Sequence, residues 1–326
     1  MRKEIALALS QARLLPQAHA NAFEVEEIPT LAHSYVVRVR LLDPDAPVPS
    51  LIFKRSGASA AAFLTIREAR FYRSIAPTLP SGLTPRCFFS DDQGGAATLL
   101  LEDLRGSHQV CETSCPTLEQ ATLFVEALAE LHASGPPSLA EEWARRVGST
   151  AYDTIGGRLG LLPEFIDRFL AANEADLVPW ERELLRAVAA AHERLAGFAK
   201  DQTVLHGDAN YWNALYAPAR AVLLDWGNAC MGPGAIDVAH AVALNLPRDV
   251  GREWEALLIE AYCRRLSALG SPEKPGDFGM KYRLAVAYAV GVPAGQWTAG
   301  VPRDTWRSLL ANALAAARDL DVVSML

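Results

Sequence analysis

The chain has 326 residues, of which 50% are hydrophobic and 21% are charged; this composition supports an ordered core in one large domain or two lobes and argues against wholesale disorder. Its 31 basic and 38 acidic side chains give a formal net charge of −7, which argues against a general nucleic-acid binder because such proteins present a basic surface. Five cysteines are too few for a disulfide scaffold, so we expect free thiols and a cytoplasmic location.

The first hundred residues have the patterns of strands and one helix. Tyr35–Leu42 alternates apolar and basic residues, as a half-buried strand does, and Leu51–Phe53 forms a second apolar strand. Apolar residues at helical spacing predict a helix over Ala58–Ser74. Cys87–Ser90 and Ala97–Leu101 predict a hairpin around a turn rich in aspartate and glycine.

After a polar connection the pattern becomes mostly helical. Thr117–His132 is amphipathic, and Thr117 with Gln120 can form a capping box at its start. Two short apolar strands, Ala214–Tyr216 and Ala221–Leu224, fit a hairpin among the helices. Helix-like patterns also cover Trp180–Phe198, Ile236–Leu246, Arg252–Leu269, Lys281–Val290 and Thr305–Val323.

The longest uncharged run, Leu284–Pro302, is long enough to raise the question of a membrane span. Glycines, a proline and a glutamine interrupt it. We therefore assign the run to the core of a soluble protein and expect no membrane partner.

The residues with the clearest chemistry lie in two neighbouring segments. His206-Gly207-Asp208 begins a short polar loop that ends at Asn213, and Asp225 follows the next apolar strand in the sequence Asp-Trp-Gly. Strand pairing would bring these loop ends to one edge, where carboxylate and amide oxygens suit Mg²⁺. A spare carboxylate there can orient a hydroxyl and accept its proton during phosphoryl transfer. The alternative is that these residues are turn formers and caps.

The pattern HGDxxxxN, an apolar strand and then DWG resembles the aminoglycoside phosphotransferase and choline kinase-like family, which are small-molecule kinases with a protein-kinase-like fold. The resemblance implies that Asp208 is the catalytic base, that Asn213 and Asp225 bind Mg²⁺, and that His206 supports the loop. Downstream, a glycine-proline turn and helix resemble another family segment. This implies that Asp237 is structural and bonds the catalytic loop.

The same resemblance implies a nucleotide site in the N-terminal half. Lys54 would contact the α- and β-phosphates, held by an ion pair with Glu68 on the following helix. The backbone of the segment Glu102-Asp103-Leu104 resembles the hinge against which adenine rests. The alternatives are a solubilising lysine at a strand end, a glutamate on a solvated helix face and an ordinary strand with an acidic end.

One segment departs from the kinase pattern. Protein kinases cover the phosphates with a GxGxxG loop, whereas the corresponding Thr30–Ser34 contains no glycine. Ser34 or backbone amides are then the expected phosphate donors. This departure supports a second hypothesis, a nucleotide-binding pseudokinase or scaffold, although Lys54, Asp208, Asn213 and Asp225 are all present. A protein kinase is a poorer interpretation because the HRD, DFG and APE set is missing.

We therefore predict an α+β, bilobal, protein-kinase-like fold. Residues 1–104 form an antiparallel-sheet lobe that binds nucleotide, residues 105–116 form a hinge, and residues 117–326 form a mainly helical lobe with the catalytic loop. The predicted activity is ATP- and Mg²⁺-dependent phosphorylation of a small-molecule hydroxyl, with GTP left open as the donor. The expected partner is a hydroxylated small molecule and not a nucleic acid, and the oligomeric state is left open.

The acceptor is not specified by these patterns. Four acidic residues precede the catalytic loop: Glu174, Asp176, Glu181 and Glu183. They could attract a cationic aminoglycoside or a choline-like amine, or they could form a solvated helix face. A sugar is also a possible acceptor. Trp297, in a glycine-rich segment that we expect to be a loop, is a candidate for the acceptor pocket. His132, His192 and His240 lie on predicted helices, where we expect packing or solvated imidazoles.

Overall fold

The structure is a computed structural model that describes residues 1–15, 22–28, 34–56, 62–111, 115–134, 143, 145–148, 150–200, 203–271 and 275–326. The chain divides into two compact units, the first Met1–Gln109 with Val222–Asn228 and the second Val110–Ala221 with Ala229–Leu326. The segment Val222–Asn228 thus belongs to the first unit although it follows much of the second in sequence. The domain limits predicted above stay a prediction.

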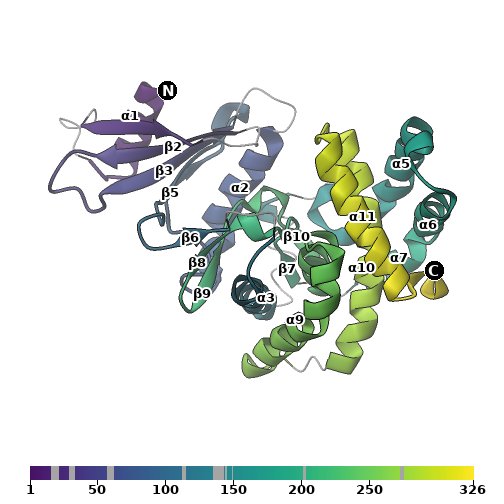
Figure 1. Ribbon diagram of the computed structural model, residues 1–326. Helices are drawn as coiled ribbons and strands as arrows, with labels where there is room; N and C mark the ends of the chain where they lie inside the picture. The colour runs from purple at the N-terminus through teal and green to yellow at the C-terminus, as the bar shows by residue number, and fades with distance from the viewer. Residues whose placement is uncertain are drawn as a thin grey trace. The chain divides into compact units, whose positions relative to one another are not determined.

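The first unit is built on a five-stranded antiparallel sheet with the strand order β1-β2-β3-β5-β4; Figure 1 labels its strands β2, β3 and β5. Its strands are β1 Phe23–Glu27, β2 Ser34–Leu41, β3 Ser50–Ser56, β4 Cys87–Asp91 and β5 Thr98–Glu102, and its helices are α1 Arg2–Gln11 and α2 Ala62–Ser74. Short 3₁₀ turns cover η2 Ala76–Thr78, η3 Gln93–Gly95 and η7 Trp226–Asn228. In this register Lys54 of β3 lies opposite Val36 of β2 and Leu99 of β5.

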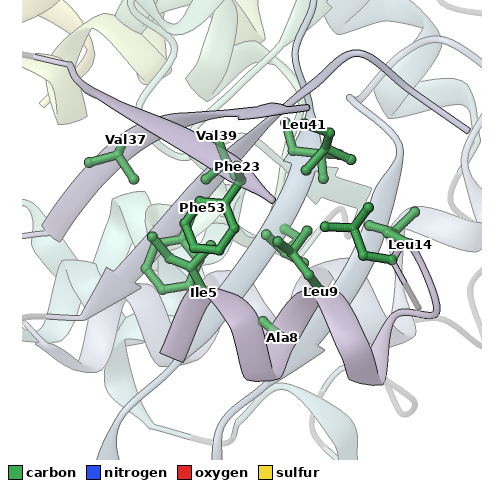
Figure 2. Packing of buried hydrophobic residues seen from close by; sticks show 12 residues of the cluster. Ile5, Ala8, Leu9, Leu14, Phe23, Val37, Val39, Leu41 and Phe53 are labelled. Carbon is green, nitrogen blue, oxygen red and sulfur yellow. The ribbon is translucent and has the colours of Figure 1, made fainter. Parts of the chain in front are cut away.

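The core of this unit lies between α1 and the sheet. Ile5 and Leu9, one helical turn apart on α1, are fully buried against alternate residues of β2 such as Val37 and Val39 (Figure 2). Spacings of four along a helix and two along a strand each place side chains on one face, so the two apolar faces meet. The basic residues between the valines, such as Arg38, point to the other face, as the alternating pattern predicts.

Most predicted elements of this unit are confirmed, including the strands β2 and β3 and the β4–β5 hairpin. The helix predicted over Ala58–Ser74 is present as α2, with its first four predicted residues outside the described part. Two elements were not predicted, α1 and β1. Each is short, and its burial depends on the sheet rather than on its own pattern.

The second unit is mainly helical. Its helices are α3 Leu118–Ala133, α5 Ile155–Asn173, α6 Pro179–Ala190, α7 His192–Phe198, α8 Ala235–Ala239, α9 Arg248–Ala268, α10 Pro275–Thr298 and α11 Arg303–Asp319, with a π-helical turn η8 at His240–Leu244. Its strands are β6 Gln109–Val110, β7 Thr203–Leu205, β8 Ala214–Ala217, β9 Arg220–Leu223 and β10 Cys230–Gly232. Its 3₁₀ turns are η4 Ala151–Asp153, η5 Glu174–Asp176, η6 Tyr211–Asn213 and η9 Val322–Met325. Gln109 of β6 and residues 222–223 of β9 belong to the first unit.

The cap predicted for the first helix of this unit is present. The Thr117 hydroxyl accepts from the Gln120 backbone N–H, and the Gln120 side chain accepts from the Thr117 backbone N–H. Two predicted helices are each divided in the structure. The Trp180–Phe198 pattern forms α6 and α7, and the Ile236–Leu246 pattern forms α8 followed by η8.

The glycine-rich segment near the C-terminus is helical, so the loop predicted around Trp297 is wrong. Helix α10 continues through Gly291 and Pro293 as far as Thr298. A Cβ at Gly291 would lie 2.5 Å from a methyl carbon of Leu162 on α5. The glycine therefore allows close packing of two helices and does not end one. Over the part of the chain that the structure describes, none of the helices has both the length and the apolar character of a membrane span.

Candidate active site

The loop between β7 and β8 holds Asp208 through its neighbours. Gly207 has a φ of 75°, a conformation that glycine adopts without steric cost. The Asn210 Nδ2 donates to Asp208 Oδ1 at 2.6 Å. The Asn213 Nδ2 donates to the Asp208 backbone oxygen at 2.9 Å and to its Oδ2 at 3.2 Å. Two side-chain amides thus fix the carboxylate. The bonds from Asn213 use its Nδ2 and not its amide oxygen.

Asp237 on α8 anchors the backbone of this loop through hydrogen bonds. Its Oδ2 accepts from the His206 backbone N–H at 2.6 Å, and its Oδ1 accepts from the Gly207 N–H at 2.9 Å. His132 Nε2 lies 3.2 Å from the same Oδ2. Burial alone would raise the pKa of Asp237, but the hydrogen bonds and the nearby imidazoles outweigh burial and hold it below its usual value.

The other nitrogen of His132 connects this anchor to α9. His132 Nδ1 and the Tyr262 hydroxyl lie 2.8 Å apart. A Cβ at Gly234, in the predicted glycine-proline turn, would lie 2.5 Å from that hydroxyl and 2.6 Å from His132 Nδ1. The turn therefore needs glycine because its backbone passes directly against the buried histidine-tyrosine pair.

His240 also reaches the loop, which the sequence patterns did not predict. Its Nε2 lies 3.5 Å from Asp208 Oδ1, and its side chain is buried. Burial lowers the pKa of His240, while Asp208 and Asp237 act in the opposite direction. A signal was present in the sequence: His240 follows Asp237 by three positions, and this spacing places both on one helical face.

In the first unit, Lys54 lies between two carboxylates. Its Nζ is 2.6 Å from Glu68 Oε2 and 2.9 Å from Asp225 Oδ1. Burial alone would lower the pKa of Lys54, but Glu68 and Asp225 together hold it above its usual value. Glu68 is 1% exposed, so the alternative of a solvated glutamate is wrong.

The Asp-Trp-Gly segment is held against α2 within the same unit. Asp225 has a φ of 60°, a left-handed conformation that aspartate tolerates better than most residues. The Trp226 ring stacks on Phe71 with centroids 4.1 Å apart. Arg67 Nε donates to the Gly227 carbonyl at 3.1 Å. These contacts fix the backbone that presents the Asp225 carboxylate to Lys54.

The predicted hinge residues have partners of their own. Asp103 Oδ2 accepts from Arg38 Nε at 2.6 Å and from Ser50 Oγ at 2.7 Å. Burial would raise the pKa of Asp103, but Ser50 and Arg38 lower it. The Glu102 N–H donates to the Arg86 carbonyl, and the Leu104 carbonyl accepts from two following N–H groups. The Asp103 side chain is therefore a structural anchor of this unit, and the contact of the segment with adenine stays a prediction.

The structure describes only the last residue of the glycine-free loop. Thr30–His33 lie outside the described residues. Ser34, at the start of β2, shares a hydrogen bond of 2.8 Å with the Thr65 hydroxyl on α2. Its role toward a phosphate stays a prediction.

Three of the four acidic residues considered for a cationic acceptor are paired with arginines of the second unit. Asp176 lies 2.9 Å from Arg303, and Glu174 lies 3.6 Å from Arg182. Glu181 is buried, lies 3.2 Å from Arg307 and accepts from the Val178 N–H at the start of α6. Glu181 is therefore part of the packing of the second unit, whereas Glu174 and Asp176 form exposed ion pairs. Trp297 packs edge-on against Phe169, with ring centroids 5.8 Å apart.

The two side chains predicted to bind Mg²⁺ belong to different compact units, Asn213 to the second and Asp225 to the first. The Asn213 Nδ2 is used in bonds to Asp208, which leaves its Oδ1 as an acceptor, and the Asp225 side chain is 44% exposed. Hard oxygen donors of this kind fit Mg²⁺. Among the described residues, no group of three or more His, Cys, Asp or Glu side chains has the arrangement of a metal site.

One comparison with known proteins shows the family of this chain. A sequence profile of the phosphotransferase enzyme family, APH, matches residues 24–274. No curated protein matches the chain in sequence.

Solved structures share the fold at low sequence identity. Choline kinase from Cryptosporidium parvum Iowa II is 12% identical, with 98% of this chain and 94% of that chain covered and a TM-score of 0.64. Choline kinase LicA from Streptococcus pneumoniae is 13% identical, with both chains covered completely and a TM-score of 0.59. A thermostable mutant of aminoglycoside phosphotransferase APH(4)-Ia, in a ternary complex with ADP and hygromycin B, is 13% identical, with 94% and 99% covered and a TM-score of 0.54. The predicted α+β fold of protein-kinase-like small-molecule kinases is confirmed.

Proposed function

Because the chain belongs to the phosphotransferase enzyme family, we propose that it transfers the γ-phosphoryl group of ATP to a hydroxyl of a small molecule. The observation that carries the proposal is the Asp208 carboxylate, which two asparagine amides hold while Asp237 fixes the loop backbone beneath it. A carboxylate immobilised in this way fits the task of orienting a hydroxyl, because positioning provides much of the rate in phosphoryl transfer.

Each step is assigned to a side chain. Asp208 orients the acceptor hydroxyl and accepts its proton as the oxygen–phosphorus bond forms and the bond to the departing diphosphate oxygen breaks. Lys54, kept charged by Glu68 and Asp225, is assigned to the α- and β-phosphates of the nucleotide. Asn213 and Asp225 would hold Mg²⁺, which when bound neutralises charge on phosphate oxygens.

The remaining assignments follow the family pattern. The backbone of Glu102, Asp103 and Leu104 would contact adenine, and Ser34 would donate to a phosphate. His206 and Asp237 are structural supports of the catalytic loop. Some solved structures of the same fold are named for choline or carry hygromycin B. For this chain we propose an aminoglycoside-, choline- or sugar-like alcohol as the acceptor.

The test is a screen of hydroxylated metabolites for ATP consumption in the presence of Mg²⁺, with GTP as a second donor. Replacing Asp208 with Asn should lower kcat about 10²- to 10⁴-fold because the proton acceptor is lost. The matched control is Asp167→Asn, at an exposed position of α5. Equal ATP consumption by the Asp208→Asn protein would contradict the proposal. Nucleotide binding without consumption against any acceptor would favour a pseudokinase.

A further inference from the structure

The helix beneath the catalytic loop contacts that loop at two points. Asp237 accepts hydrogen bonds from the backbone of His206 and Gly207. His240, three positions later, places its Nε2 beside the Asp208 carboxylate. Residues three apart lie on one face of a helix. A single face of α8 and η8 therefore contacts both the backbone of the loop and the Asp208 carboxylate.

The imidazole of His240 is buried and aimed at the base. Its side chain is 8% exposed, and its Nε2 has no hydrogen-bond partner among the described residues. The distance of 3.5 Å to Asp208 Oδ1 is slightly longer than a good hydrogen bond. Catalytic hydrogen bonds are often long without substrate and shorten in the reacting complex. A buried nitrogen with this placement is therefore poised to bond the carboxylate.

The backbone at His240 is held in place from the other side. The chain forms a π-helical turn over His240–Leu244, a feature often found at functional sites. Asn245 donates twice to the His240 carbonyl, from its backbone N–H at 3.2 Å and from its Nδ2 at 2.8 Å. These bonds fix the His240 backbone, and so they fix the position from which its imidazole extends to Asp208.

Resting on the function proposed above, we propose that His240 is a positioning residue, whose neutral imidazole donates from Nε2 to Asp208 Oδ1. Asn210 donates to the same oxygen at 2.6 Å, whereas Oδ2 has the longer bond of 3.2 Å from Asn213. Two donors on Oδ1 stop the carboxylate from rotating. They leave Oδ2 as the oxygen that meets the acceptor hydroxyl.

The charges around His240 agree with a neutral donor. Burial lowers its pKa, and the nearby His206 and Arg158 side chains act in the same direction. Asp208 and Asp237 oppose this effect without reversing it. Because the imidazole stays neutral near pH 7, its proton can rest on Nε2 without adding a positive charge beside the base.

The first test compares two variants of His240 by their kinetics. His240→Gln keeps an N–H donor of similar reach, and His240→Leu removes it. We expect His240→Leu to lower kcat about 10- to 30-fold, as the loss of a hydrogen bond to a charged group does, and to change KM for ATP less than about twofold. His240→Gln should keep kcat within about threefold of the parent. The control is His192→Leu, on α7, whose Nδ1 lies 2.9 Å from the Ala189 carbonyl oxygen.

A merely structural role would give a different result. Both His240 variants would then lose activity together, in parallel with a fall in melting temperature, and that outcome would overturn the proposal. Parental kcat in His240→Leu would also overturn it. Inactivity of the parent protein against every acceptor would count against the proposed function and leaves the second test to decide on His240.

The second test does not depend on turnover. In ¹⁵N-labelled protein the His240 imidazole, assigned with His240→Gln, should be neutral with its proton on Nε2 at pH 7. Asp208→Asn should shift the Nε2 resonance because the acceptor carboxylate becomes an amide, and Asp167→Asn should leave it unchanged. An unchanged Nε2 resonance in Asp208→Asn, or a proton on Nδ1, would contradict the proposed bond from His240 to Asp208.

Discussion

Asp237 shows how one buried carboxylate can organise a loop by binding its backbone. It is fully buried, and its acceptor oxygens are used by two backbone N–H groups and by His132. These groups remove the cost of burying a charge, because they replace the hydrogen bonds that water would make. The result is a fixed backbone immediately before Asp208.

We predict that Asp237→Asn destabilises the protein by about 3 kcal/mol at pH 7, because an amide presents N–H groups to backbone donors. The folded-state pKa of Asp237 lies below the ordinary 3.8, so its stabilising effect is complete above that value and is lost as the pH falls through the folded pKa. Urea unfolding at pH 7, 5 and 3 should show the difference between parent and variant shrinking only at the lowest pH.

The control for this prediction is Asp167→Asn, which should change stability by less than about 0.5 kcal/mol because the residue is exposed. A destabilisation by Asp237→Asn that stays constant down to pH 3 would show that the ionised carboxylate is not what holds the loop.

Lys54 and Glu68 form the second buried charged group. We predict that Lys54→Met destabilises the first unit by about 3 kcal/mol because it leaves the Glu68 carboxylate buried without its cation. The double variant Lys54→Met with Glu68→Gln should recover part of this loss. Chemical denaturation of the two single variants and the double variant measures the coupling; additive losses would mean that the two residues act independently.

At the scale of elements, close packing decides where glycine is required. Gly234 allows the turn before α8 to pass the His132 imidazole and the Tyr262 hydroxyl, and Gly291 allows α10 to approach α5. Neither requirement is visible in a local pattern. Gly291 is one of the glycines that suggested a loop around Trp297, whereas the helix continues through it and a neighbouring leucine leaves no room there for a side chain.

We predict that Gly234→Ala lowers stability by about 1–3 kcal/mol, since the new methyl group would displace the histidine-tyrosine pair. Gly160→Ala is the matched control, because nothing lies within 4 Å of the added Cβ on α5. That control should raise stability by about 0.5–1 kcal/mol through helix propensity. Thermal unfolding of both variants checks the prediction, and equal effects of the same sign would contradict it.

At the scale of the whole molecule, the proposed residues belong to both compact units. Lys54, Glu68 and Asp225 belong to the first, and Asp208 and Asn213 belong to the second. The chain returns to the first unit for Val222–Asn228, and this return carries Asp225 into the neighbourhood of Lys54. The proposed roles are therefore divided between the two units, and neither unit contains all of the residues.

We predict that ATP raises the melting temperature by a few degrees when Mg²⁺ is present, because a ligand at about one hundred times its Kd adds about 2.7 kcal/mol to the folded state. EDTA should abolish most of the shift. Asn213→Ala and Asp225→Ala should each reduce the Mg²⁺ dependence, and Asp167→Asn should preserve it. The same shift in EDTA and in Mg²⁺ would contradict the assignment of the two residues to the cation.

Local chemistry determined what the sequence alone could reveal: alternating valines predicted β2, the Thr117–Gln120 cap predicted the start of α3, and HGDxxxxN with DWG indicated the family. Such signals are carried by residues close together along the chain. The tertiary structure decided the rest, including the burial of α1 on the sheet, Lys54 against Asp225, and His240 beside Asp208. These contacts join residues from different elements, and so they exist only once packing has fixed the distances between those elements.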